Sequence, residues 1–220
     1  MGRQSRTTVR RLPKRGRYDS RTLHAILDEG VVCHVGFAVD GQPYVLPMSY
    51  ARDGERLFLH GSVASRLMGH LAESVEACVT VTLVDGLVLA RSQFHHSMNY
   101  RSVVAFGRAR AVREPEEKRH ALRALVEHLV PGRGDDSRPP SPEELAATEV
   151  VEFPLHEASA KVRVGPPGDA AGDLGLDHWA GVIQLTQMAG EPVAAPDLKD
   201  DIPLPAYVRD YRRPTEDARQ

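Results

Sequence analysis

Three Asp-Gly pairs in the first half of the chain limit its fold more than any other feature. Each pair stands between segments rich in branched aliphatic, threonine and aromatic residues: Asp40-Gly41, Asp53-Gly54 and Asp85-Gly86. Both residue types tolerate the positive φ that tight β-hairpin turns require. The pairs therefore predict three hairpins, in each of which consecutive strands run antiparallel.

The segments that these turns would join predict the strands, at residues 31–39, 43–51, 56–60, 76–84, 87–94 and 102–112. In the fourth segment, Val79, Val81 and Leu83 alternate with Thr80 and Thr82, so one face points inward and the other meets a wetter surface. We expect further strands at residues 148–155, 160–164 and 179–185. Short antiparallel strands at this spacing favour a small barrel.

Three helices are expected beside the strands. Residues 18–29 have apolar residues at helical spacing, with Asp19 or Ser20 as the N-cap and Gly30 as the stop. Residues 62–73 and 114–129 predict the second and third helices, the latter with an apolar stripe that runs from Leu122 to Leu129. Residues 131–142, rich in proline, glycine and charge, predict a connector.

The length of 220 residues suits one domain, which we place at residues 18–185 between a basic arm (1–17) and a proline-rich tail (186–220). No apolar run approaches the roughly 20 residues that span a bilayer, so we do not expect a membrane protein. The basic arm has no apolar segment behind it, which favours a cytoplasmic protein over a secreted one. Cys33 and Cys78 lie in strand-like segments and are expected to be reduced core thiols.

The net charge of -2 gives no general attraction to nucleic acid. Cations crowd the N-terminal arm, but no aromatic residue is interleaved with them before Tyr18. We therefore expect no nucleic-acid partner and treat the arm as a solvated terminus.

The stretch FLHGSVASRLMGHL, residues 58–71, is the first candidate site, because it runs from an apolar strand into Gly61, Ser62, Ser65 and Arg66. If Ser62 caps the following helix, the free backbone N–H groups of the first turn, two hydroxyls and a guanidinium would together favour a phosphate. A plain capped helix with a surface arginine explains the same residues equally well.

The polar stretch RSQFHHSMNYRSVVAFG, residues 91–107, is the second candidate site. Adjacent residues of a strand point to opposite faces, so His95 and His96 are not expected to chelate one metal ion. Asn99, Tyr100 and Arg101 add hydrogen-bond donors there, and a solvated hairpin loop is the alternative. Pro47 marks a third candidate, because a proline within a strand leaves nearby backbone groups free to meet a ligand.

Together these segments resemble the pyridoxamine 5'-phosphate oxidase-like flavoproteins, and in particular a flavin-nucleotide-binding branch that includes nitroimidazole-resistance reductases. The likeness covers about residues 9–185 and is carried by AILDEGVVCHVGFAVDGQPYVLPMSYARDGERLFLHGS, DGLVLARSQFHHSMNYRSVVAFGRA, KVRVGPP and WAGVIQL. It implies a mainly β, α+β fold: a six-stranded antiparallel split β-barrel with peripheral helices. It also implies a homodimer with FMN at the subunit interface.

The resemblance also implies which residues contact FMN. Residues 47–50 would lie along the isoalloxazine ring, and the turn after His60 would hold the phosphate. The full set is Pro47, Met48, Ser49, Tyr50, His60, Ser62, Ser65, Arg66, Asn99, Tyr100, Arg101, Lys161, Arg163 and Trp179. Where oxidase relatives have a Ser-Arg-Lys string, this chain has Ser65, Arg66 and Leu67, so one phosphate contact is missing or supplied elsewhere.

These features favour an FMN-dependent oxidoreductase in which flavin N5 exchanges a hydride with a nicotinamide donor or a small organic substrate. His60, His95 and Tyr100 are the candidate proton donors. The closing Arg-x-His motif of true pyridoxamine phosphate oxidases is replaced by DHWAGVIQL, so we do not expect vitamin B6 oxidation. A non-catalytic FMN-storage or sensor protein, and a split barrel that uses heme or deazaflavin, remain as alternatives.

Overall fold

Alternating apolar residues build one continuous antiparallel sheet. In the computed structural model, which describes residues 6–213, ten strands pair in the order β1-β9-β6-β5-β2-β3-β4-β8-β7, and β10 lies along β5. The strands are β1 (Gly16–Arg17), β2 (Val32–Val39), β3 (Gln42–Asp53), β4 (Arg56–Ser62), β5 (Glu76–Leu89), β6 (Ser97–Arg108), β7 (Arg110–Ala111), β8 (Thr148–Pro154), β9 (Ala158–Arg163) and β10 (Gly181–Gln184). The antiparallel split-barrel class is confirmed, but the expected number of six strands is wrong, because short strands such as β1, β7 and β10 extend the sheet.

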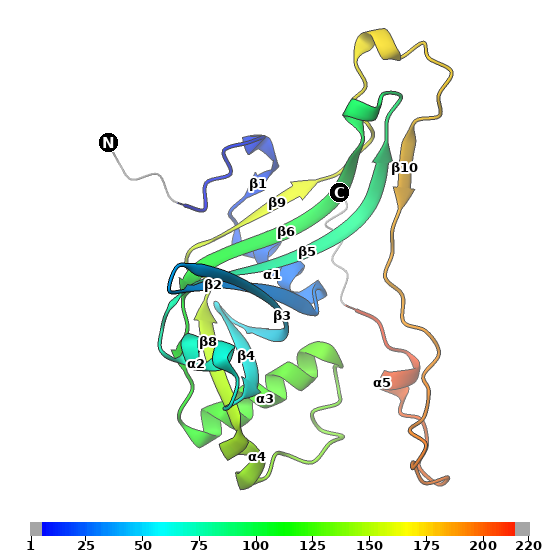
Figure 1. Cartoon of the computed structure of the whole chain (residues 1–220). Coiled ribbons are helices and arrows are strands. Elements are labelled where there is room, and N and C mark those ends of the chain that lie inside the picture. Colours follow the sequence, from blue (N-terminus) through cyan, green and yellow to red (C-terminus); the bar gives the residue numbers. More distant parts are fainter. Residues whose placement is uncertain (1–5, 214–220) are drawn as a thin grey trace.

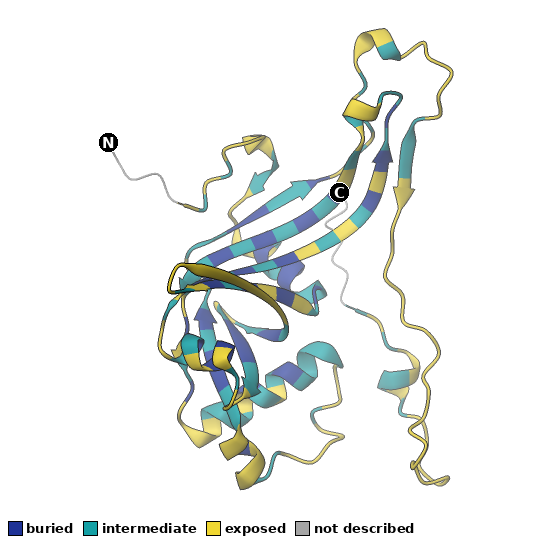
Figure 2. Ribbon diagram, in the orientation of Figure 1, coloured by how far each residue is buried: buried dark blue, intermediate teal, exposed yellow. Residues whose placement is uncertain are grey.

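Five α-helices surround the sheet within the described residues: α1 (Ser20–Glu29), α2 (Arg66–Ala72), α3 (Pro115–Leu129), α4 (Pro142–Ala147) and α5 (Ala206–Arg209). None of them is long and apolar enough to cross a membrane. The β5–β6 hairpin and β10 extend beyond the rest of the sheet as an arm (Figure 1). Buried residues alternate with partly or fully exposed ones along much of β5 and β6 (Figure 2), as the valine–threonine pattern predicts.

The core lies between α1 and the curved sheet. Ile26 and Leu27 of α1 are buried in the same cluster as Val79, Val81 and Phe153. The side chain of Asp19 caps α1 by accepting a hydrogen bond from the Thr22 amide at 2.9 Å. The predicted first helix is therefore confirmed, and its apolar side closes the barrel.

Two of the three predicted hairpins form. Asp40 and Gly41, with φ of 49° and 79°, connect β2 to β3 as a two-residue turn. Gly54, with φ of 59°, lies in the turn between β3 and β4. The positive φ values explain why Asp-Gly occurs at these turns.

The third predicted hairpin is wrong, because Asp85 and Gly86 lie inside β5 at a bulge, and the strand continues to Leu89. The Asp85 carboxylate accepts hydrogen bonds from Arg101 of β6. A Cβ atom on Gly86 would lie 2.9 Å from the Ile183 carbonyl oxygen of β10. Pairing on both sides of β5 therefore holds these residues in the strand.

The predicted helix at residues 62–73 begins later than expected. Ser62 is the last residue of β4 and pairs with Thr148 of β8, so α2 starts at Arg66 with Ser65 as its N-cap. Helix α4 was not predicted at all. The sequence nevertheless contains its start signal, because Ser141 and Glu144 form a capping box and Pro142 stands at the first helical position.

Tyr211 and Arg213, near the end of the described chain, form hydrogen bonds with the C-terminal ends of α1 and α3. The Arg213 guanidinium donates hydrogen bonds to carbonyl oxygens at the end of α1, those of Asp28, Glu29 and Gly30, and to that of His128 at the end of α3. The Tyr211 hydroxyl donates to the Leu129 carbonyl oxygen at 2.8 Å. A cation at helix C-termini is favourable because carbonyl groups there lack helical partners.

Candidate functional site

Five of the predicted cofactor residues share one face of the sheet. Directly paired residues of neighbouring antiparallel strands point to the same side, and so do alternate residues of one strand. The register forms three rows across the strands: Pro47–His34–Thr80–Val104, then Thr82–Ser102–Lys161, then Val84–Tyr100–Arg163. We call this side of β2, β3, β5, β6 and β9 the outer face; it carries the predicted residues Pro47, Ser49, Tyr100, Lys161 and Arg163.

The outer face favours an anionic ligand with hydrogen-bonding groups. Its three rows contain hydroxyls, the His34 ring and two cations, but no aspartate or glutamate. His34 is exposed and lies between Pro47 and Thr80, a position that sequence reasoning missed. The period-two alternation of the β2 sequence, with Cys33 and Val35 buried on either side of His34, was the signal that could have placed it.

Arg163 is a buried cation whose hydrogen-bond partners are all neutral groups. Its side chain donates to the carbonyl oxygens of Gly165 and Pro166, each at 3.0 Å, and to the amide oxygen of Asn99. Its Nε atom is enclosed and has no hydrogen-bond partner within residues 6–213. Burial, and then the nearby charge of Arg15, lower the pKa of Arg163. A negative group placed here would relieve an uncompensated charge.

Three other predicted residues lie on the opposite side of the sheet. Met48 packs against the core, and Tyr50 is fully buried with its hydroxyl donating to the Leu27 carbonyl oxygen at 2.5 Å. Burial raises the pKa of Tyr50. The buried Arg101 is paired with Glu29 and Asp85. The polar atoms of Tyr50 and Arg101 are therefore engaged inside the protein, where they stabilise the barrel.

The turn between β4 and α2 presents the predicted phosphate residues. Ser62 Oγ accepts a hydrogen bond from the Ala64 amide at 3.2 Å, and Ser65 Oγ accepts one from the Met68 amide at 3.5 Å. Arg66 is exposed and has no ion pair among the described residues. The two serines therefore order the turn locally, and Arg66 is the group there that is left for an external anion.

Other predicted residues lie on the arm, away from this turn. His95 ends a short 3-10 helix (Gln93–His95) between β5 and β6, and Trp179 precedes β10 with 67% of its surface exposed. Within residues 6–213, no group of three or more His, Cys, Asp or Glu residues could hold a metal ion. In one chain, the arm and the β4–α2 turn do not form a single site (Figure 1).

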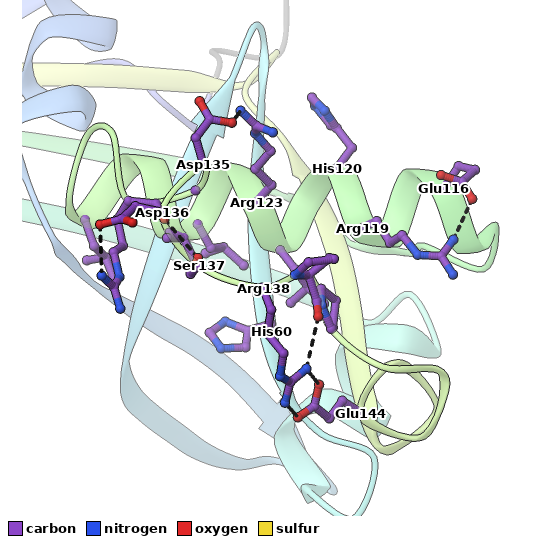
Figure 3. A pocket seen from close by; sticks show the side chains of 18 residues that line it. His60, Glu116, Arg119, His120, Arg123, Asp135, Asp136, Ser137, Arg138 and Glu144 are labelled. Carbon is purple, nitrogen blue, oxygen red and sulfur yellow. Dashed lines mark hydrogen bonds and ion pairs between the residues drawn. The ribbon is translucent and has the colours of Figure 1, made fainter. Parts of the chain in front are cut away.

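A pocket of 1220 Å³ opens between α3 and the connector, with His60 of β4 in its floor (Figure 3). This volume exceeds the range of about 300–1,000 Å³ that is usual for small-molecule sites. Helix α3 contributes an apolar wall of Leu122, Leu125, Val126 and Leu129. We call this space the α3 pocket.

Four arginine–carboxylate pairs border the α3 pocket. They are Arg119–Glu116 at 2.5 Å, Arg123–Asp135 at 2.7 Å, Arg133–Asp136 at 3.6 Å and Arg138–Glu144 at 2.6 Å. These exposed pairs cost little to separate, so their arginines can turn to an anionic ligand. The rim was missed in the sequence, although the spacing of Arg119 and Arg123 puts both on one side of the predicted helix.

The His60 ring makes no hydrogen bond with the described residues. Its Nδ1 atom is enclosed without a partner, and burial lowers its pKa. Burial therefore favours the neutral form of the ring, the form in which histidine binds a metal.

Comparisons with known proteins agree with this architecture. The model of the family described as pyridoxamine 5'-phosphate oxidase matches residues 19–162. A search of curated protein sequences gives no match.

Two solved structures are similar over nearly the whole chain. The flavocytochrome Anf3 from Azotobacter vinelandii is 40% identical, with a TM-score of 0.88 over 94% of this chain and 96% of its own. An FAD- and heme-binding protein from Mycobacterium smegmatis is 36% identical, with a TM-score of 0.86 over 89% and 96%.

A third structure, a candidate 5-nitroimidazole antibiotic resistance protein from Bacteroides thetaiotaomicron, is 26% identical, with a TM-score of 0.57 over 67% of this chain and 86% of its own. The matched family model and the two structures with more than 30% identity agree with the split-barrel fold described above. The chain belongs to the pyridoxamine 5'-phosphate oxidase family.

Proposed function

We propose that the chain binds FMN and works as an oxidoreductase between a nicotinamide donor and a small organic substrate. A bound flavin supplies hydride transfer at its N5 atom, and the protein binds and orients it. The observation that carries the proposal is the outer face, where Pro47, Ser49, Tyr100, Lys161 and Arg163 share a surface whose rows contain no carboxylate.

In this proposal the chain's residues have separate tasks. Lys161 and Arg163 offset negative charge at the β9 end of the outer face, and Arg66 does the same at the β4–α2 turn. The hydroxyls of Ser49, Thr82 and Ser102 offer hydrogen bonds. His60, His95 and Tyr100 remain the candidates for holding a proton that the substrate receives.

We infer that a second copy of the chain covers the exposed apolar residues beside the outer face. Val32, Tyr44, Val45 and Leu46 are each at least 38% exposed on β2 and β3, and Val84, Leu87, Met98 and Ile183 are similarly exposed on the arm. An apolar surface of this kind favours a protein partner. In a homodimer with FMN at the interface, the arm of one subunit could complete the site of the other.

A second cofactor, heme, is favoured by the α3 pocket. The pocket combines an apolar wall, an arginine rim and the neutral His60 ring, the groups that an amphiphilic iron porphyrin with two carboxylates requires. One similar structure is named a flavocytochrome, and another an FAD- and heme-binding protein. We therefore propose heme as a companion to the flavin, with FAD as the alternative to FMN.

The absorption spectrum of the purified protein tests these proposals together. Two bands in the near-ultraviolet and blue indicate flavin, and a Soret band indicates heme. Chromatography of the extracted cofactor then distinguishes FMN from FAD. Steady oxidation of NADH or NADPH in the presence of an acceptor supports an oxidoreductase, whereas tightly bound flavin without turnover supports storage or sensing.

A further inference from the structure

We propose that His60 is the ligand that the α3 pocket offers to the iron of a heme bound there, and that the described lining of this pocket offers no second ligand. This inference rests on the proposed heme function. It assigns one residue of this chain and predicts an iron that is open to small external ligands.

The placement of His60 fits a ligand role. β4 is paired on both sides, with β3 and β8, and His60 lies opposite Val150, which is fully buried. The ring points from this strand into the pocket (Figure 3). A side chain on a central strand is held more firmly than one on a loop.

The two ring nitrogens of His60 are in different environments. Nδ1 is enclosed by the protein and has no hydrogen-bond partner. Nε2 is not among the enclosed atoms and makes no hydrogen bond with the described residues, so it is the nitrogen that we assign to the iron. A neutral imidazole with one free nitrogen is the form in which histidine binds iron.

The remaining lining residues leave no second ligand. They include no cysteine, methionine or tyrosine, and the only other histidine is His120. Its Nε2 atom lies 3.1 Å from Asp53 Oδ2, and its ring edge contacts Phe58. In Figure 3 His120 projects from α3 on the side away from His60. Among the described residues of one chain, the pocket would therefore offer the iron one ligand, His60.

The rim of the α3 pocket suits the two carboxylates of heme. Arg123 and Arg138 are paired with Asp135 and Glu144, which are 77% and 49% exposed at their side chains. Because these carboxylates are well solvated, a ligand carboxylate can replace them at small cost. The leucine and valine wall would cover the apolar part of the ring system.

Titration with hemin tests the inference on three full-length proteins: wild type, His60→Ala and His120→Ala. We expect wild type and His120→Ala to bind one equivalent and to give the same Soret band. His60→Ala should bind at least tenfold more weakly with a shifted band, and added imidazole should restore the wild-type spectrum. Cyanide or carbon monoxide should shift the wild-type band, because one axial position is open.

The outcomes separate the two proposals. If wild type takes up no hemin, the heme function itself fails, and the inference fails with it. If wild type binds hemin and His60→Ala gives an unchanged spectrum and affinity, the heme function stands and the ligand assignment is overturned.

Two further variants keep the test decisive if His60→Ala does not fold, which circular dichroism would reveal. His60→Gln keeps a polar side chain of similar size and should lose the histidine-ligated spectrum. Val126→Trp fills the pocket and leaves His60 in place, so it should abolish hemin uptake. Normal uptake by Val126→Trp would place heme elsewhere and overturn the inference.

Discussion

Arg101 of β6 donates two hydrogen bonds, of 2.9 and 2.6 Å, to the Asp85 carboxylate of β5. Asp85 lies at the bulge where the sequence predicts a hairpin turn. Glu29 at the end of α1 binds the same guanidinium. The Arg101 side chain is only 3% exposed, and its pKa is raised first by its hydrogen bond to Glu29 and also by that to Asp85. One arginine thus joins a helix and two strands.

Replacing Arg101 should be strongly destabilising. Arg101→Met leaves two partly enclosed carboxylates without their cation, and we expect a loss of about 3–5 kcal/mol in the free energy of unfolding, measured in urea. Asp85→Asn keeps the pair with Glu29 and should cost less, about 1–3 kcal/mol. An Arg101→Met protein as stable as wild type would show that this cluster contributes nothing.

The Arg101 cluster shows what local sequence can and cannot predict. Asp40-Gly41 and Asp53-Gly54 lie where paired strands reverse direction, and Asp40, Gly41 and Gly54 have positive φ. Asp85-Gly86 carries the same signal, but Arg101 and the backbone of β10 hold it in a strand. The decisive partners are remote in sequence, so the pair alone could not reveal the bulge.

The candidate site likewise has parts that could be predicted from the sequence and parts that depend on tertiary packing. Pro47 could be singled out as a proline within a predicted strand and Tyr100 as part of a polar stretch, whereas His60 and Lys161 were named through the family resemblance. The α3 pocket could not be foreseen, because its walls come from α3 and the connector, and only the packing of α3 over β3 and β4 brings them to His60. The burial of Tyr50 and Arg101 likewise depends on α1, which covers that side of the sheet.

Gly86 should be intolerant of any side chain. In Gly86→Ala, the new Cβ atom would lie 2.9 Å from the Ile183 carbonyl oxygen, so β10 should separate from β5. We expect faster amide hydrogen exchange in residues 181–184. Gly69→Ala is the control, because a Cβ atom added there would meet nothing within 4 Å, and it should stabilise α2 by up to about 1 kcal/mol. Equal exchange in both variants would contradict the close packing of β10.

The contact of Arg213 with two helix ends should be measurable. In Arg213→Ala, carbonyl oxygens at the ends of α1 and α3 lose a charged donor, and we expect a loss of about 1.5–3 kcal/mol in urea unfolding. The neighbouring Arg212 is exposed, and its one hydrogen bond with the described part of the chain goes to the Tyr211 carbonyl oxygen. Arg212→Ala should therefore change stability by less than about 0.5 kcal/mol. If the two variants lose the same stability, the hydrogen bonds from Arg213 to the two helix ends have no specific role.

Acid should weaken the fold through His128. Burial is the main reason that its pKa is lowered, while its Nε2 atom lies 2.7 Å from the Gly30 carbonyl oxygen. His128 binds a proton near its ordinary pKa of 6.5 in the unfolded chain but only at lower pH in the folded chain. The contribution of neutral His128 to the free energy of unfolding is therefore complete above pH 6.5 and is lost as the pH falls toward the pKa of the folded state. Between pH 7.5 and 5.5, wild type should lose more stability than His128→Gln. Equal losses of stability in wild type and His128→Gln would contradict the role given to His128.

Charge on the outer face should control flavin affinity. Lys161→Met removes a cation of the outer face, and Arg66→Ala removes one of the β4–α2 turn. Because we propose that each offsets negative charge of FMN, we expect FMN affinity to fall about ten- to a hundredfold in either variant. Arg21→Ala removes an exposed arginine of α1 that lies neither on the outer face nor in the β4–α2 turn, so it should leave FMN affinity unchanged. Fluorescence quenching of FMN measures all three variants. Equal affinity in Lys161→Met and wild type would remove Lys161 from the site.

Flavin uptake by cofactor-free wild-type protein, followed through the quenching of flavin fluorescence, tests flavin binding by this chain most directly. We expect saturable binding of FMN, or of FAD, at one flavin per chain, and a bound flavin that NADH or NADPH reduces. A protein that is colourless when purified and quenches neither FMN nor FAD at micromolar concentration would contradict it.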